Sequence, residues 1–117
     1  MYQVAVLKDD NFLKEINKHK YLIVLFSSPD CGSCQLAKKH VIDTAEQFKD
    51  IEVRECYIDA APETIKKYKI NSSPLIKIFV DGESVYTGFG VRTPTDLYYQ
   101  FKGFFPSINY YEDLLDD

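Results

Sequence analysis

The sequence predicts an α/β fold with a central mixed sheet flanked by helices. Apolar runs typical of buried strands alternate with segments whose apolar residues recur every three or four positions, as in amphipathic helices. The longest apolar run, from Tyr21 to Phe26, leads into such a helical segment. Later, Asp81-Gly82 separates two strand-like runs, which is a strong signal for a two-residue hairpin turn.

The first half of the chain is predicted to form two strand–helix pairs. We expect a strand over Gln3–Leu7, then a helix over Phe12–His19 that Asp9-Asp10-Asn11 can cap. The apolar run over Tyr21–Ser27 is long enough for a strand buried on both faces. The next helix is expected from Cys34 to about Lys49, because apolar residues recur there at helical spacing. These residues are Ala37, Val41, Ala45 and Phe48.

The second half is predicted to form a strand, a short helix, a hairpin and a last helix. β-branched residues favour a strand over Ile51–Asp59, and Pro62 suits the first position of a short helix. The hairpin strands are expected over Leu75–Val80 and Ser84–Thr87. The order βαβαβαββα implies parallel strands with right-handed crossovers, followed by an antiparallel edge. Thr93-Pro94 opens the last helix, whose apolar side carries Leu97, Tyr98, Phe101 and Phe104.

The size and charge of the chain argue against several classes of protein. Its 117 residues suit a single domain, 1–117, in which residues 105–117 form an acidic, aromatic C-terminal extension. A net charge of −4 without a basic cluster argues against a nucleic-acid partner. No apolar run approaches the roughly 20 residues that cross a bilayer, and no signal-like segment opens the chain. We therefore expect a cytoplasmic protein without a membrane partner.

Two thiols, Cys31 and Cys34, lie at the predicted junction between the buried strand and the long helix. Free backbone N–H groups and the helix dipole favour a thiolate there, and the thiolate is the form that attacks disulfides. The spacing also lets the second sulfur reach back and close a disulfide. We interpret the pair as a redox site without a metal, although an inert pair or half of a zinc site are alternatives. The other possible zinc ligands, Cys56, His19 and His40, include no second closely spaced pair.

Several further motifs accompany this pair. They are Asp9-Asp10-Asn11-Phe12, Cys31-Gly32-Ser33-Cys34, Ile58-Asp59, Tyr68-Lys69-Ile70-Asn71-Ser72-Ser73-Pro74, Phe79-Val80-Asp81-Gly82-Glu83 and Gly88-Phe89-Gly90. With these motifs in this order, the chain resembles the thioredoxin family from about Val4 to Phe104. The resemblance implies a thioredoxin fold and a thiol–disulfide oxidoreductase that works without a bound cofactor.

The resemblance also implies roles within the dithiol motif. Cys31, at the helix start, is expected to attack, and Cys34, one turn further in, is expected to resolve the mixed disulfide. Gly32 permits a tight backbone, and Ser33 replaces the proline of thioredoxins themselves. Ser33 either donates to a Cys31 thiolate, which makes the site more oxidising, or is a solvated serine that merely fits the first turn. Asp30 replaces the usual tryptophan and either repels the thiolate or caps the helix.

A second departure from the family lies behind the dithiol. The buried aspartate usual six residues before the first cysteine is Leu25 here, and Glu55 stands where the family often has lysine. Our hypothesis is that Glu55 points inward under Cys34 and takes over proton transfer as a catalytic residue. The alternative is an outward, solvated Glu55. Strand alternation does not decide between them, because Val53, Glu55 and Tyr57 share one face while Arg54, Cys56 and Ile58 share the other.

The substrate groove is inferred from the same resemblance. Pro74 matches the family's cis-proline, and Ser73 would pair with an extended substrate through its backbone. Gly90 is expected to keep the other wall of the groove low, unless the glycines there mark only a strand bulge. With Gly32 and Ser33, these residues form the expected substrate-binding set.

The function expected from the sequence is reduction of protein disulfides by a monomer. Its partners would be disulfide-containing proteins and an external reductase or small thiol that recycles the dithiol. The alternative is an adaptor or binding subunit that keeps the fold with a vestigial dithiol. The extension over residues 105–117 either packs against the sheet edge or docks a basic partner.

Overall fold

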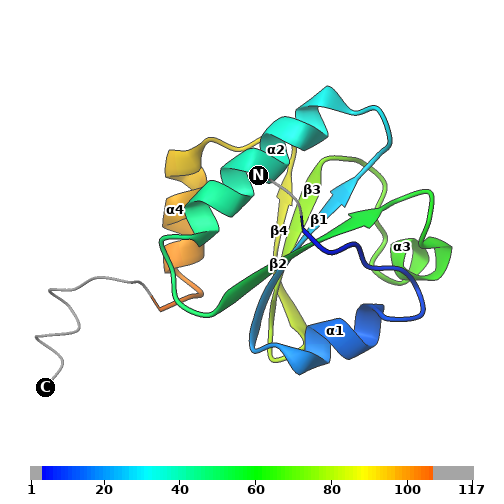
Figure 1. The fold of residues 1–117 in the computed structure, drawn as a ribbon, viewed down its shortest axis with the longest axis horizontal. Coiled ribbons are helices and arrows are strands. Elements are labelled where there is room, and N and C mark those ends of the chain that lie inside the picture. The colour runs from blue at the N-terminus through cyan, green and yellow to red at the C-terminus, as the bar shows by residue number, and fades with distance from the viewer. Residues whose placement is uncertain (1–3, 107–117) are drawn as a thin grey trace, which may run out of the picture.

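The computed structural model describes residues 4–106 and has an α/β architecture, as predicted (Figure 1). The sheet order is β2-β1-β3-β4, with β1 parallel to β2 and antiparallel to β3, and with β3 antiparallel to β4. In chain order the elements are α1 (Phe12–Lys18), β1 (Tyr21–Ser27), α2 (Gly32–Ala45), β2 (Ile51–Tyr57), α3 (Pro62–Lys67), β3 (Leu75–Val80), β4 (Glu83–Phe89) and α4 (Pro94–Lys102). The predicted mixed sheet is therefore confirmed.

Helices cover both faces of this sheet, α2 and α4 on one face and α1 and α3 on the other (Figure 1). Strand alternation divides the buried side chains between two cores. The core under α1 and α3 includes Phe12, Val24 and Phe79, and the core under α2 and α4 includes Leu25 and Phe101. Because β1 contributes to both cores, it is apolar almost throughout, and this is the run that is most visible in the sequence.

The predicted N-terminal strand is reduced to a single bridge within the described residues. Val6 pairs in parallel with Glu55, whose backbone bonds to Ala5 and Leu7. The chain then turns away at Lys8, whose N–H donates to the Asn11 side chain at 2.7 Å. Gln3, at the predicted start of the strand, lies outside the described residues.

The long helix begins and ends earlier than predicted. It begins at Gly32 because Cys31, and not a later residue, occupies the N-cap position. It ends at Ala45 because the N–H groups of Gln47 and Phe48 make tighter i→i−3 bonds, to the carbonyls of Thr44 and Ala45. Asp50 then takes a left-handed φ of 58°. Phe48 is nevertheless buried from this turn, which is why its spacing extended the helical pattern.

The helix cap predicted at Asp9-Asp10-Asn11 serves a different helix. Asp9 accepts hydrogen bonds from the backbone N–H groups of Glu63 and Thr64, at the start of α3. Desolvation raises the pKa of Asp9, but these bonds and one from the Thr64 hydroxyl outweigh it, so the pKa is lowered overall. At α1, the N-cap residue Asn11 makes no side-chain capping bond.

The hairpin turn follows the prediction. Asp81 and Gly82 have φ values of 51° and 84°. Two consecutive residues with positive φ are the requirement of a type I′ turn, which glycine meets at little cost. The turn fixes β4 as the antiparallel edge of the sheet.

A buried lysine on β3 gives the protein a pH-dependent stability. Lys77 donates to the hydroxyls of Ser84 and Thr87 at 3.0 and 2.8 Å, and its Nζ lies 5.7 Å from the centre of the Tyr68 ring. No carboxylate pairs with it among the described residues. Burial lowers the pKa of Lys77 from its ordinary value of 10.5. Between the lowered value and 10.5 the unfolded chain binds more protons at this lysine, so its contribution to stability rises with pH there.

We expect Lys77→Met to raise the free energy of unfolding by about 1 kcal/mol at neutral pH, because it removes a buried charge without an ion partner. This advantage over the wild type shrinks as the pH approaches 10.5. Urea unfolding of both proteins at several pH values measures the difference. Lys67→Met is the control, because exposed Lys67 lies over the same Tyr68 ring. If the difference in the free energy of unfolding between Lys77→Met and the wild type does not change with pH, the pKa of Lys77 is not lowered by burial.

Candidate active site

The two thiols of the motif form a disulfide at the start of α2. Cys31 follows the loop after β1 and is the N-cap residue, and Cys34 lies in the first turn of the helix. Their Cα atoms are 5.2 Å apart, within the range that disulfides span. The Cys31 sulfur accepts a hydrogen bond from the Cys34 N–H at 3.2 Å. A sulfur thus occupies the position at which a serine or aspartate oxygen usually caps a helix.

The two cysteine residues differ in their access to solvent. Cys31 is partly exposed, whereas Cys34 is completely buried. Cys31 is therefore the more accessible of the two cysteines. After reduction, the N–H that caps Cys31 Sγ and the positive end of the α2 dipole both favour a thiolate on Cys31.

The two residues between the cysteines lie at the surface. Gly32 and Ser33 are both exposed. A Cβ atom on Gly32 would meet nothing within 4 Å, so no close contact requires glycine there. The Ser33 hydroxyl lies 3.4 Å from Cys31 Sγ, which is within hydrogen-bonding distance for sulfur. Ser33 is thus in a position to donate to a Cys31 thiolate.

The loop before β3 lies beside the dithiol loop. The Ser73–Pro74 peptide bond is cis, and Pro74 is buried. The Pro74 carbonyl accepts a hydrogen bond from Gly90 N–H at 2.9 Å, and Ser73 Oγ lies 2.5 Å from Ser28 Oγ, three residues before Cys31. Gly90 has a φ of 72°, which favours glycine, with open space around it. The structure therefore brings the predicted groove residues to one end of the sheet.

Comparison with known proteins identifies the family to which this chain belongs. The Thioredoxin family model matches residues 3–102. The chain belongs to the thioredoxin family. Thioredoxin-like protein YusE of Bacillus subtilis is 30% identical over 77% of this chain and 92% of its own length. Thioredoxin 1 of Synechococcus elongatus is 31% identical over 83% of this chain and 92% of its own.

Other relatives are much longer proteins. Protein disulfide isomerase-like 1-3 of Arabidopsis thaliana is 36% identical over 77% of this chain but only 16% of its own length. The chain thus spans about a sixth of the protein disulfide isomerases that it matches. Among solved structures, yeast mitochondrial thioredoxin 3 has a TM-score of 0.76 at 22% identity, over 86% of this chain and 94% of its own, which shows the thioredoxin fold. Family and relatives support the general class of thiol–disulfide oxidoreductases.

Glu55 lies inside this thioredoxin fold, beneath the first turns of α2. Its side chain is 3% exposed, so the alternative of an outward, solvated Glu55 is wrong. The carboxylate accepts hydrogen bonds from Ser27 Oγ at 2.8 Å, Lys38 Nζ at 3.3 Å and the Tyr57 hydroxyl at 3.3 Å. A buried carboxylate needs such partners, because burial without them costs several kcal/mol.

Two members of this buried group were not recognised in the sequence. Lys38 reads as part of a solvated helix face, yet it is buried and forms an ion pair with Glu55. The signal that points to it is its spacing, since Lys38 lies one turn after Cys34 on the face that carries Ala37 and Val41. Ser27 ends an apolar strand, and only the structure shows that its hydroxyl faces the carboxylate.

Asp30 does not cap α2. The cap is the Cys31 sulfur itself, and Asp30 is exposed with a left-handed φ of 55°, which aspartate tolerates better than most residues. The capping alternative for Asp30 is therefore wrong. A carboxylate stands next to Cys31 in the sequence and faces solvent.

The third cysteine is separate from the dithiol. Cys56 is fully buried in the core under α1 and α3. Desolvation by burial, with a smaller effect of the Asp9 charge, raises the pKa of its thiol to about 12. Cys56 is therefore inert at neutral pH. No group of three or more His, Cys, Asp or Glu side chains in residues 4–106 is arranged to hold a metal ion.

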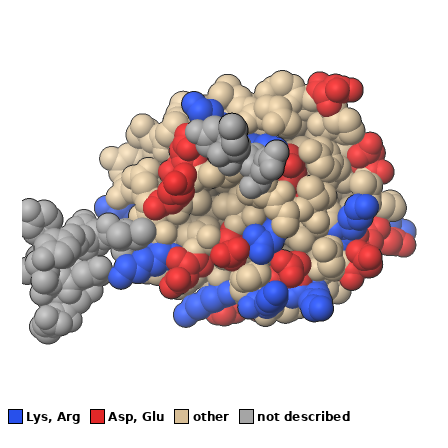
Figure 2. All heavy atoms as spheres, in the orientation of Figure 1, with Lys and Arg blue, Asp and Glu red and all other residues tan. Residues whose placement is uncertain are grey.

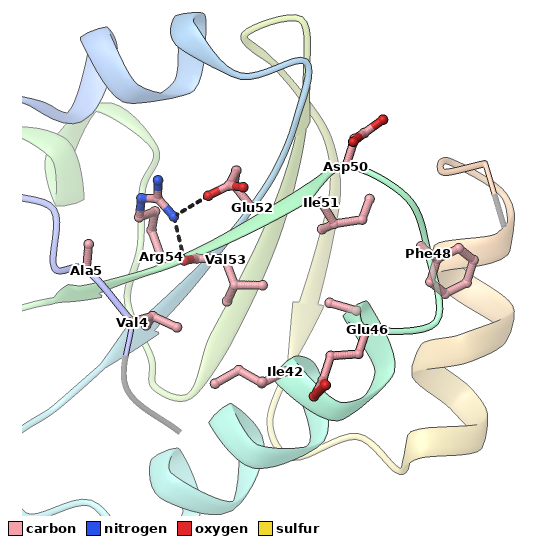
Figure 3. A pocket seen from close by; sticks show the side chains of 11 residues that line it. Val4, Ala5, Ile42, Glu46, Phe48, Asp50, Ile51, Glu52, Val53 and Arg54 are labelled. Carbon is pink, nitrogen blue, oxygen red and sulfur yellow. Dashed lines mark hydrogen bonds and ion pairs between the residues drawn. The ribbon is translucent and has the colours of Figure 1, made fainter. Parts of the chain in front are cut away.

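A cavity of about 580 Å³ lies at the opposite end of α2 from the disulfide (Figure 3). Ile42 from α2 and Glu46, the C-cap residue that follows the helix, line it, together with residues of β2 and the preceding turn. The Arg54–Glu52 ion pair, at 3.1 Å, lies at its wall. The described lining includes no thiol, so this cavity does not belong to the redox site.

The surface adds no continuous basic area on the side that Figure 2 shows. Lys and Arg side chains alternate there with Asp and Glu, and much of the face carries neither (Figure 2). A nucleic-acid site needs basic residues gathered on one surface. Of the helices in the described part of the chain, none has the length and apolarity to span a membrane.

Proposed function

We propose that this protein reduces disulfide bonds in other proteins through a Cys31/Cys34 dithiol–disulfide cycle. The observation that carries the proposal is the cap of α2, where Cys31 Sγ accepts the Cys34 N–H while the two sulfurs are bonded to each other. This geometry favours the thiolate at Cys31 and keeps the second sulfur within reach.

The cycle has two balanced steps. The Cys31 thiolate attacks one sulfur of the substrate disulfide, which forms a mixed disulfide and releases the other substrate sulfur as a thiolate. Cys34 then loses its proton and attacks Cys31 Sγ, which releases the second substrate thiolate and closes the Cys31–Cys34 disulfide. Two electrons pass from the dithiol to the substrate, and the released thiolates take up two protons.

The proton on Cys34 is the difficult part of this cycle, because that thiol is completely buried. We propose Glu55 as the group that accepts it. Glu55 lies on the α2 side of the sheet and is paired with Lys38, one helical turn below Cys34. Ser27 and Tyr57 also donate to the carboxylate, so its position is fixed by three hydrogen bonds.

We expect Glu55→Gln to slow resolution of the mixed disulfide by about 100-fold or more, because general-base catalysis is lost while the side-chain shape is kept. Attack by Cys31 should be unchanged. Rapid-quench measurement of the mixed disulfide with a labelled cystine peptide separates the two steps. Glu52→Gln on the same strand is the matched control, since Glu52 is partly exposed and its partner is Arg54 rather than Lys38. An unchanged resolution rate in Glu55→Gln excludes Glu55 as the base.

The partners follow from the same chemistry. The substrates would be proteins with accessible disulfides, and an external reductase or a small thiol would return the protein to its dithiol form. We propose that it acts as a monomer in the cytoplasm, where the glutathione pool keeps most thiols reduced.

Reduction of insulin disulfides by the full chain tests the activity. Equilibration of the Cys31–Cys34 pair with glutathione buffers tests whether the protein donates or withdraws electrons.

An adaptor without redox activity is the second candidate. The observation that favours it is the environment of the dithiol, where an exposed Asp30 precedes Cys31 and apolar Leu25 is buried at the position of the family's usual aspartate. An adaptor would bind its partner equally well with both cysteines replaced by serine. A reductase would lose all insulin reduction in the same variant.

A further inference from the structure

A hydrogen bond between two serine hydroxyls joins the loop that leads to Cys31 to the loop that leads to β3. Ser28 lies in the loop between β1 and Cys31, and Ser73 lies in the loop before β3. Their Oγ atoms are 2.5 Å apart, at the short end of the range for O–H···O bonds. The two residues are 45 positions apart in the sequence, so this bond connects two loops that are not adjacent along the chain.

Each serine adjoins a residue that is held from another direction. The Ser27 hydroxyl donates to buried Glu55, and the Ser27 carbonyl accepts from Ile58 N–H at 2.9 Å. On the other loop, the Pro74 carbonyl accepts from Gly90 N–H at 2.9 Å. The bond between Ser28 and Ser73 therefore links two anchored segments and fixes the Ser73 backbone relative to Cys31.

The bond uses the side chain of Ser73 and leaves its backbone free. The antiparallel ladder between β1 and β3 begins at the pair Phe26–Leu75, one residue beyond Pro74. No backbone hydrogen bond joins Ser73 to another residue in the described part of the chain. Its N–H and C=O are thus available to an extended polypeptide, which binds to an exposed backbone edge through main-chain hydrogen bonds.

We propose that Ser28 is a positioning residue for protein substrates, acting through the hydroxyl of Ser73. The Ser28–Ser73 bond sets how the free backbone of Ser73 faces Cys31, so that a bound polypeptide presents its disulfide to that sulfur. Ser28 itself contacts neither the reacting sulfurs nor the substrate. This inference rests on the proposed function, because it concerns how the same dithiol receives its substrate.

The test compares a protein substrate with a small one in Ser28→Ala. With insulin, KM is expected to rise about fivefold, which is the fold-change that corresponds to loss of one neutral hydrogen bond. With a small aromatic disulfide, which needs no strand pairing, the second-order rate constant should stay unchanged. Ser28→Thr retains the hydroxyl and should restore KM. Ser72→Ala is the matched control, since exposed Ser72 makes no side-chain hydrogen bond in the described structure.

A double-mutant cycle identifies the partner hydroxyl. Ser73→Ala should raise KM as much as Ser28→Ala does, and the double variant should be no worse than either single one. Effects that multiply, or an equal loss with the small disulfide, would overturn the proposal.

A second measurement does not require activity. Exchange of the Gly90 amide hydrogen reports on the bond between Gly90 N–H and Pro74 O. We expect it to become several-fold faster in Ser28→Ala but not in Ser72→Ala. Unchanged exchange overturns the positioning role, whether or not insulin is reduced. If exchange is faster in Ser28→Ala but the wild-type protein reduces no disulfide, the Ser28–Ser73 bond still couples the two loops. In that case only the proposed function is overturned.

Discussion

Replacement of Cys31 by serine is expected to lower insulin reduction by at least about a thousandfold, to the background rate of the assay. The physical reason is that a serine hydroxyl is not ionised at neutral pH and does not attack sulfur, whereas the Cys31 thiolate does. The N-cap geometry is preserved in Cys31→Ser, because a serine oxygen accepts the Cys34 N–H as well as sulfur does. Turbidity from the released insulin B chain measures the rate.

Cys34→Ser gives a different result that identifies the order of the two thiols. Cys31 still attacks, but nothing resolves the mixed disulfide, so the protein accumulates as a covalent complex with its substrate. Mass spectrometry under non-reducing conditions detects this complex. A Cys31→Ser variant that forms the complex instead would reverse the assigned roles. Insulin reduction that survives in Cys31→Ser, or that the wild type never shows, supports the adaptor.

The architecture was predictable from the sequence because few alternatives fit its apolar pattern. The run over Tyr21–Ser27 is buried on both faces, so it needs no partner information to be recognised. Asp81-Gly82 specifies its own turn through backbone conformation. The boundaries were less predictable, because they depend on hydrogen bonds between distant segments. Asp9 could be recognised as a cap, but only folding places it at α3 rather than at α1.

The site was predictable in its sulfur chemistry but not in its surroundings. A CxxC motif after a buried strand identifies Cys31 and Cys34 without any tertiary contact. The orientation of Glu55 depends on which face of β2 lies under α2, and both faces carry polar side chains, so alternation alone did not decide it. Lys38 was not recognised for the same reason. A lysine on a helix is expected to be solvated unless a buried partner such as Glu55 is known.

We expect Phe105, the first residue of the C-terminal extension, to contribute to the stability of the core. It is buried among Tyr21, Phe48 and Phe101, with ring centres 5.4, 6.0 and 5.5 Å away. Phe105→Ala should lower the free energy of unfolding by about 3 kcal/mol, because it loses apolar burial and leaves a cavity. Urea unfolding measures the change.

Tyr99→Ala is the control for this variant, since Tyr99 is exposed on α4 and its loss should change stability by less than about 0.5 kcal/mol. The remainder of the extension, residues 107–117, lies outside the described residues.

Truncation after Pro106 keeps Phe105 and so tests that remainder by itself. If stability is retained while one partner is lost, the acidic segment is a docking element; a loss of stability comparable to that of Phe105→Ala would mean that the segment packs against the fold.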